Sequence, residues 1–402
     1  MDYIEIKEIC EANTEATEEL IEEQVYYAVA KEDLERKLDK LLAKYKIIVR
    51  KFAKPSIAEF QMQYFAHRVF KKNGLINKHL KHAFFKDLDE IKRGFLEHWA
   101  KYPWKYTFSV ITKQPADEFF EMRDVFSGEE FLVYSPGISK GLQEKSIELW
   151  YLLIAFNGSC WQTYGPIGEL AGFQAGDIHY YTALLKPDHW PISEQDILAN
   201  VEKNPVPYFM LLSGSNFPLV MHGDHQIVQM VAEFDCNGIN GQALAKHFIV
   251  DQRDAVYQLS LKGWLEFPHY AVAYYDKKEA LLRLSALTEL GYQQLISHLN
   301  RYGFDLPDDP DFRVSVAMQK TGEDILKRDL LADPYQELFG EVVSDENSKA
   351  ADKLNEVMAH LVPDINAGRV PDFAAVARKT GVNVKVVADL AKELIERMKG
   401  AK

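Results

Sequence analysis

The chain has 402 residues, of which 47% are hydrophobic, 12% aromatic and 27% charged. This composition excludes a disordered chain and predicts a globular protein of two or three domains. The net charge of −13 disfavours a protein whose whole surface binds nucleic acid or an anionic membrane.

Signals for membranes and secretion are not seen in the sequence. We find no run of about 18 apolar residues that would predict a membrane span. The N-terminus has no basic region followed by an apolar stretch, so we expect no signal peptide. The three cysteines, Cys10, Cys160 and Cys236, are far apart in the sequence and odd in number. This pattern is typical of free thiols in a reducing cytoplasm, where we expect the protein to work.

Residues 1–104 are predicted to form a helical region. The first thirty residues contain nine acidic side chains and one lysine, while Leu20, Ile21 and Val25 follow a helical stripe. Two interpretations stay open: a solvated helix face, or an acidic arm for a basic partner. Further apolar positions at helical spacing follow up to Trp99.

Residues 105–320 are predicted to form a β-rich central domain. Tyr106–Thr112 alternates and is rich in β-forming residues, which predicts a strand. Two apolar runs flank Asn157-Gly158, a pair that supplies the positive φ values of a tight type I′ hairpin turn. We therefore expect an antiparallel sheet or a partly closed barrel. Cys160 is interpreted either as a buried strand cysteine or as a thiol nucleophile.

Further strands and a helix are predicted at the C-terminal end of the central domain. The sequence predicts a pair of strands at 271–275 and 280–284, and then a helix capped by Thr288 and ended at Gly303. A last strand is expected at 313–317.

The segment from Phe120 to Glu129 reads Phe-Glu-Met-Arg-Asp-Val-Phe-Ser-Gly-Glu. It resembles the strand–turn–strand segment of uncharacterised bacterial proteins that often carry a SEC-C zinc tail. Trp264 and the stretch Leu281–Ala286 resemble the same proteins. This sequence has no cysteine-rich tail, so the metal-binding element of those proteins is absent.

His222, Asp224 and His225 are metal-capable residues within four positions. They would suit a metal-dependent hydrolase, although such a site needs further ligands and a base. The alternative is a hairpin that turns at Gly223-Asp224 between two apolar strands, with the histidines beside the turn.

The C-terminal module, residues 321–402, contains a two-helix corner at 372–398. Asp372 can cap a helix, and Gly381 can end it with a positive φ. Asn383 can cap a second helix. A helix from Ala350 to Leu361 is expected to end before Pro363 and to precede the corner.

The spacing of small and apolar residues in this corner is that of two helices crossing steeply around one core. Gly381 follows Ala377 by four positions, and Val387 and Leu390 lie six and nine positions beyond it. These twenty or so residues resemble the bacterial helix-turn-helix. The resemblance implies that the helix from Asn383 reads a DNA major groove.

The face that would meet DNA is mixed in character. It would present Asn383, Val384, Lys385, Ala388, Asp389 and Lys392. It has none of the Arg, Gln or Ser side chains that usually grip bases and phosphates. From Arg369 onward eight basic residues oppose four acidic ones, a net charge of +4, which is typical of a nucleic-acid module. The predicted nucleic-acid-binding residues are Arg378, Lys379, Asn383, Lys385 and Lys392.

Taken together, the sequence predicts an α+β protein with a helical N-terminal region, an antiparallel β-rich centre and a helical C-terminal module. We expect a cytoplasmic interaction or regulatory protein without catalysis or cofactor, whose C-terminal corner contacts DNA or a protein. One alternative is the metal-dependent hydrolase. The other is a scaffold whose C-terminal helices only pack or form a homo-oligomer.

Overall fold

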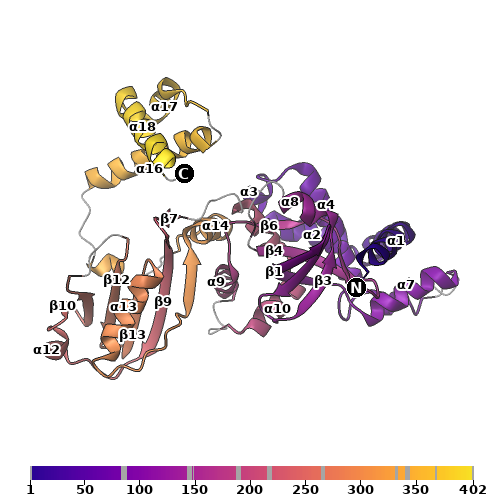
Figure 1. Ribbon diagram of the computed structural model, residues 1–402, viewed down its shortest axis with the longest axis horizontal. Helices are drawn as coiled ribbons and strands as arrows, with labels where there is room; N and C mark the ends of the chain where they lie inside the picture. The colour runs from indigo at the N-terminus through magenta and orange to yellow at the C-terminus, as the bar shows by residue number, and fades with distance from the viewer. Residues whose placement is uncertain are drawn as a thin grey trace. The chain divides into compact units, whose positions relative to one another are not determined.

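The computed structural model describes residues 2–400 except 83–87, 143–146, 148, 187–191, 215–219, 264–267, 331–333, 340–344 and 367–368 (Figure 1). Trp264 therefore lies outside the described residues. The prediction of an α+β fold with helices at both ends and a β-rich centre is confirmed. The chain forms two compact units, Met1–Asp333 and Pro334–Lys402. The expected boundary at residue 321 lies within α14 (Val316–Leu326), in the first of these units.

The N-terminal region of the first unit is helical. Its elements are α1 (Tyr3–Glu32), α2 (Leu34–Lys44), α3 (Lys46–Val49), α4 (Lys54–Phe70), α5 (Ile76–His79) and α7 (Glu90–Lys101).

Helix α1 begins and ends at capping residues, and the apolar side chains on one of its faces are buried. The Asp2 carboxylate accepts hydrogen bonds from the first-turn amides, and Asp33, with φ of 54°, ends the helix in the left-handed region. Leu20, Ile21 and Val25 are buried, as the helical stripe predicts. The glutamates of the acidic segment are exposed, and this distribution favours the solvated helix face.

The first sheet is closed on itself. Its strands are β1 (Lys105–Ala116), β2 (Phe119–Asp124), β3 (Glu130–Tyr134), β4 (Leu149–Phe156), β5 (Trp161–Thr163) and β6 (Gly168–Leu170). The order is β1-β2-β3-β5-β4-β6, and β1 pairs with β4 as well, so five strands form a ring of pairings. The pairings are antiparallel except that of β3 with β5, which is parallel. The expectation of a partly closed barrel is in agreement with this ring.

The turn between β4 and β5 differs from the prediction. Among its residues only Gly158 has a positive φ, whereas a type I′ turn needs two. The Asn157 side chain instead accepts hydrogen bonds from the backbone N–H groups of Ser159 and Cys160, both at 2.9 Å. This local bonding stabilises a four-residue loop, because an asparagine side chain can imitate a backbone turn. The predicted tight turn is therefore wrong.

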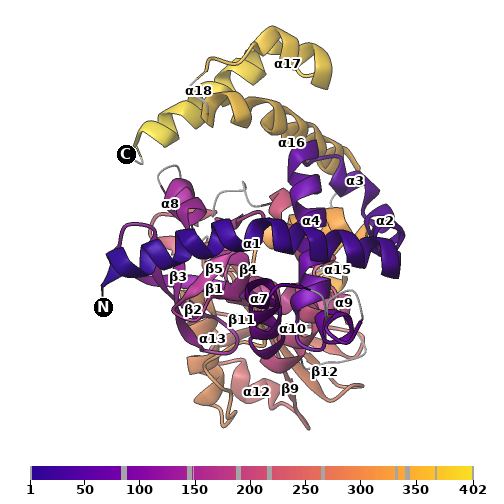
Figure 2. The same cartoon turned by 90° about the vertical axis from the view of Figure 1, so that its right-hand side faces the viewer.

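Helices cover the outer face of the ring. Figure 2 shows α1 running across the strands of the first sheet. The elements that follow β3 and β6 are α8 (Pro136–Leu142), α9 (Ala175–Leu185), α10 (Glu194–Lys203), α11 (Val206–Met210) and the 3-10 helix η1 (Leu211–Gly214). The apolar side chains of α9, α10, α11 and η1 share one core with α4 and the outer face of β1 and β4, whereas Ile138 of α8 packs with Trp150 and Leu152 on the other face of β4.

A buried polar group joins three of these elements. His67 on α4 is fully buried and lies 2.8 Å from the Glu202 carboxylate of α10. The other oxygen of Glu202 accepts from the Tyr106 backbone N–H at 2.9 Å. Burial lowers the pKa of His67 more than Glu202 raises it, so the neutral ring donates its Nε2–H to the carboxylate. The carboxylate of Glu202 and the Nε2–H of His67 are thus satisfied inside the protein, whereas the buried Nδ1 of His67 has no hydrogen-bond partner among the described residues.

The second sheet of the first unit has the order β10-β11-β12-β13-β9-β14. Its strands are β9 (Val228–Asp235), β10 (Phe248–Arg253), β11 (Val256–Leu261), β12 (Ala271–Asp276), β13 (Leu281–Ala286) and β14 (Phe312–Ser315). Helix α13 (Glu289–Asn300) packs on it, and the short α12 (Gly241–Leu244) precedes β10. Thr288 caps α13 by accepting from the Gly291 N–H at 3.1 Å, as predicted. A small hairpin of β7 (Met221–His222) and β8 (His225–Gln226) forms a two-stranded sheet of its own.

The second unit is helical. It contains α15 (Gln336–Phe339), α16 (Asp345–Asn366), α17 (Phe373–Thr380) and α18 (Val384–Gly400). The expectation that the helix before the corner ends ahead of Pro363 is wrong, because α16 continues to Asn366. Ile365 is buried against the other two long helices, and this packing offsets the backbone hydrogen bond that a proline cannot donate. No described helix is both long and apolar enough to cross a membrane.

Close contact between η1 and α14 gives a stability prediction. A Cβ on Gly214 would lie 2.8 Å from Thr321 Cγ2 and would also clash with Thr321 Oγ1. Thr321 is buried and donates to the Ala317 carbonyl at 2.7 Å, so it cannot turn away freely. We expect Gly214→Ala to lower the free energy of unfolding by about 1–3 kcal/mol, measured by denaturant titration.

Gly241→Ala is the matched control, because a Cβ at that position meets nothing within 4 Å. It should change the free energy of unfolding by about 0.5 kcal/mol or less. Equal effects of the two substitutions would contradict the close packing of η1 on α14.

Buried His79 gives a pH prediction. Burial lowers the pKa of His79 to about 4, below its ordinary 6.5. Between pH 4 and 6.5 the unfolded chain binds a proton at this histidine that the folded chain does not bind. The neutral, buried His79 therefore contributes stability that is fully present above pH 6.5 and is lost as the pH falls toward 4. The free energy of unfolding should fall between pH 7.5 and 4.5, and this fall should be about 2 kcal/mol smaller in His79→Leu than in the wild type. Denaturant titrations at pH 7.5 and 4.5 measure this, with exposed His82→Leu as control. An unchanged pH dependence in His79→Leu would contradict the assignment.

Candidate nucleic-acid interface

The corner between α17 and α18 has the capping residues that the sequence predicts. The Asp372 carboxylate accepts from the Ala375 N–H at 3.0 Å and begins α17. Gly381 has φ of 67°, and its N–H bonds to the Ala377 carbonyl at 2.9 Å. A residue with a Cβ is strained in this conformation. Asn383 then begins α18, with its Oδ1 accepting from the Lys385 N–H at 2.8 Å.

A small core ties the corner to the preceding helix. Val376 and Ala377 of α17 are buried against Val387 and Ala391 of α18. Helix α16 completes the core with Val357, Leu361 and Ile365. The three helices are thus a module with its own apolar centre. Its geometry is that of two helices crossing at a short turn, with a third helix packed on them.

The predicted nucleic-acid-binding side chains are all exposed and lie close together in the sequence of the corner. Arg378 and Lys379 are in the last turn of α17. Asn383, Lys385 and Lys392 are exposed on α18. Of the other residues expected on this face, Val384 and Asp389 are exposed, and Ala388 is half-buried.

Two valines make the exposed face of α18 more apolar than a solvated helix needs. Val384 is 48% and Val386 54% exposed. Both lie in the first turn of α18, beside Lys385. This turn therefore offers a lysine, two apolar groups and the positive end of a helix dipole within a few residues.

Arg369, which precedes α17, forms an ion pair with Asp364 of α16. Arg369 donates from Nη2 to Asp364 Oδ1 at 2.7 Å and from Nε to the same oxygen at 3.0 Å.

The charged groups of the corner differ in how far they are engaged within the protein. Arg378 donates from Nε to the Ala374 carbonyl at 3.3 Å, which leaves most of its guanidinium donors available. Among the exposed residues described in α18, from Val384 to Lys392, Asp389 is the acidic one.

The structure places His222, Asp224 and His225 on the β7–β8 hairpin. His222 pairs with His225 across the turn at Gly223-Asp224, and all three metal-capable residues are exposed. The His225 ring contacts the His269 ring at a centroid distance of 4.5 Å. Within the described ranges, no group of three His, Cys, Asp or Glu side chains is arranged to hold a metal ion. The hydrolase stays a prediction without a supporting contact.

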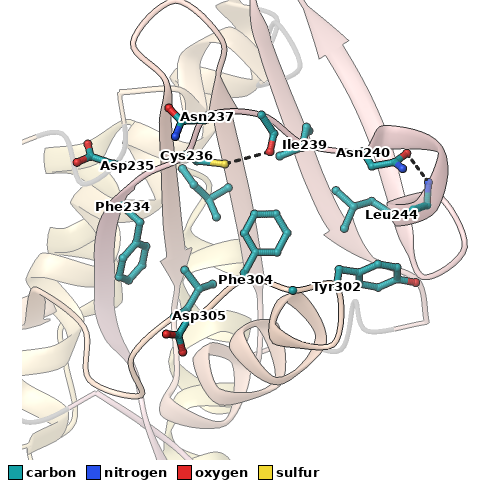
Figure 3. Close-up of a pocket in the computed structure, with 15 residues that line it drawn as sticks. Phe234, Asp235, Cys236, Asn237, Ile239, Asn240, Leu244, Tyr302, Phe304 and Asp305 are labelled. Carbon is teal, nitrogen blue, oxygen red and sulfur yellow. Dashed lines mark hydrogen bonds between the residues drawn. The ribbon is translucent and has the colours of Figure 1, made fainter.

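A pocket of about 700 Å³ at one end of the second sheet was not predicted (Figure 3). Phe234, Leu244 and Phe304 contribute apolar side chains, and Asp235 and Asp305 contribute carboxylates. Two further polar groups are already engaged within the protein. Cys236 donates its S–H to the Gly238 carbonyl at 3.4 Å, and Asn240 caps α12 by accepting from the Ala243 N–H. This lining does not favour one class of ligand.

Sequence reasoning also missed a contact between two thiols. Cys10 on α1 and Cys160 before β5 touch each other inside the first unit. Their separation in the sequence hides this contact, because only the docking of α1 on the β4–β5 hairpin creates it. Cys160 is buried, as the interpretation of a buried strand cysteine expects, but it lies in the loop before β5 and not in a strand.

Comparison with known proteins gave no match among protein-family models, curated proteins or solved structures. The resemblances to the helix-turn-helix and to the proteins with a SEC-C tail therefore stay predictions. The function of the chain has to be inferred from the geometry and chemistry of its described residues.

Proposed function

We propose that the module of α16, α17 and α18 binds duplex DNA and that the chain is a non-catalytic regulatory protein. In this proposal the first two turns of α18 enter the major groove. The observation that carries it is the exposed first turn of α18, in which the consecutive residues Val384, Lys385 and Val386 are all exposed at a glycine-capped corner. A short turn of this kind directs one helix outward while the other two support it.

Each exposed side chain has a role that its chemistry suits. Arg378, Lys379 and Lys392 would contact phosphates, which position the protein without reading sequence. Lys385 would donate to guanine. Val384 and Val386 would meet the methyl groups of thymines. Asn383 uses its Oδ1 as a helix cap, so its amide nitrogen is the group left to donate to DNA.

The charge of the face predicts modest affinity with a clear salt dependence. The three phosphate contacts of Arg378, Lys379 and Lys392 would displace counterions, which gives a slope of about −3 in log affinity against log salt. Asp389 opposes the phosphates and weakens the contact. Between 50 and 200 mM salt the affinity should fall roughly 100-fold.

The first test is fluorescence anisotropy of the full-length protein with a pool of random duplex DNA at low salt. We expect Lys385→Glu and Arg378→Glu each to weaken binding at least about 10-fold, because each replaces a phosphate or base contact by repulsion. Asp389→Lys should strengthen binding by a similar factor.

Glu356→Lys is the matched control. It makes the same charge change as Asp389→Lys at an exposed position of α16, a helix that does not belong to the α17–α18 corner. If Asp389→Lys and Glu356→Lys strengthen DNA binding equally, the DNA is attracted to added positive charge in general and not to the face of α18. No binding by the wild-type protein at low salt would refute the proposal.

Self-association is a second candidate, favoured by the exposed valines. Val370 is 81% exposed and lies before α17, and Val384 and Val386 are about half exposed. Apolar side chains of this kind can form the centre of an interface between two copies. The C-terminal helices would then pair the chain as a scaffold.

Light scattering at increasing protein concentration tests self-association. If the valines pair two copies, the wild-type mass should rise toward that of a dimer. The double variant Val384→Ser, Val386→Ser should remain monomeric. Exposed Val316→Ser on α14 of the first unit is the control and should behave like the wild type. A monomeric wild type at all concentrations would contradict this candidate.

A further inference from the structure

Two of the three cysteines lie against each other although 150 positions separate them in the sequence. The Sγ atoms of Cys10 and Cys160 are 3.3 Å apart, and both residues are buried. A disulfide has an S–S distance of about 2.05 Å. Closing the gap therefore needs a movement of about 1 Å, which small rotations of the two side chains can supply.

The surroundings of the pair distinguish the two sulfurs. Asn157 donates from Nδ2 to Cys10 Sγ at 3.2 Å and lies 3.9 Å from Cys160 Sγ. The hydrogen bonds from Cys160 and Asn157 lower the pKa of Cys10. The neighbouring Cys10 sulfur and burial raise the pKa of Cys160. Cys10 is therefore the sulfur that carries negative charge first, and the thiolate is the reactive form.

A small pocket lies next to Asn157, the residue whose side chain contacts the Cys10 sulfur. It has a volume of about 190 Å³, and its lining includes Asn13 of α1 and Asn157 and Gln162 of the β4–β5 hairpin. One water molecule takes about 30 Å³ in the liquid, so a hydroperoxide of similar size has room there. Asn157 touches both this pocket and the Cys10 sulfur. Neither cysteine lines the pocket, so a small oxidant held there would be separated from the Cys10 sulfur by the Asn157 side chain.

We propose that Cys10 and Cys160 are a site of reversible disulfide formation driven by hydrogen peroxide. This inference rests on α1 and the first sheet and is independent of the proposed DNA binding. Cys236 has no part in it, since its S–H is bonded to the Gly238 carbonyl.

The reaction has two steps. The Cys10 thiolate attacks one peroxide oxygen, the O–O bond breaks, and the leaving hydroxide takes a proton to become water. Cys10 is then a sulfenic acid. In the second step the Cys160 thiol loses its proton, its sulfur attacks Cys10 Sγ, the S–O bond breaks, and a second water leaves. Two thiols are oxidised by two electrons, and one peroxide is reduced to two waters.

The disulfide would covalently attach α1 to the hairpin that it already contacts. Gln162 donates from Nε2 to the Cys10 carbonyl at 3.0 Å, and Asn13 donates to the Gln162 side chain at 3.0 Å. Lys7 forms an ion pair with Glu118 at 2.6 Å. These contacts hold the thiols in place before oxidation. The covalent bond would slow local opening of the first half of α1, since a cross-link limits the open states.

The test exposes the reduced full-length protein to hydrogen peroxide and then removes the excess. We expect two of the three thiols to be lost, the intact mass to fall by two hydrogens, and peptide mapping to find Cys10 joined to Cys160. The melting temperature should rise by about 5 °C, and hydrogen exchange in the first half of α1 should slow. Dithiothreitol should reverse all five changes.

Variants separate this site from general oxidation. Cys236→Ser should form the disulfide like the wild type, whereas Cys160→Ser should instead gain oxygen at Cys10. If Cys160→Ser does not fold, the peptide map of the oxidised wild type alone shows whether Cys10 is joined to Cys160. The proposal is refuted if excess peroxide leaves the wild-type thiols intact. It is also refuted if peroxide adds oxygen to Cys10 while Cys160 stays free, or links separate chains.

Discussion

The pairing of β1 with both β2 and β4 is the constraint on which the first unit depends. It closes five strands into a ring, so β4 is buried on both faces. One face of β4 joins Trp150 and Leu152 to a cluster with Phe120 and Val133. The other face joins Tyr151 to the core under the helices. The same closure carries the β4–β5 loop to α1, and the contact between Cys10 and Cys160 follows from it.

The second unit depends on a different constraint, the left-handed turn at Gly381. With φ of 67° this residue ends α17 at once and lets α18 begin within three positions. Two helices so close in sequence share one small core, and the side chains away from that core must face outward. Lys385 and the two valines of the first turn are therefore exposed by geometry. The positive charge of Lys385 favours DNA as the partner, whereas the two apolar valines favour a second copy of the chain.

The parts of the fold that the sequence predicts are those set by neighbouring residues. Asp372, Gly381 and Thr288 act as caps where their chemistry places them, because capping depends only on the adjoining turn. The same local reasoning failed at Asn157, where a side-chain acceptor competes with the tight turn, and at Pro363, where packing of Ile365 outweighs a lost hydrogen bond. The closure of β1 on β4 and the contact of the two thiols join distant segments. No local pattern encodes those partners, and the pocket in Figure 3 is likewise built from separate segments.

Hydrogen exchange of the full chain, with and without duplex DNA, shows directly whether the corner of α17 and α18 is the DNA-binding surface. If it is, DNA should slow exchange in the stretch from Arg378 to Lys392 and leave both sheets of the first unit unchanged. Slower exchange only in the first unit, or no change anywhere at a DNA concentration that saturates binding, would contradict DNA binding by this corner.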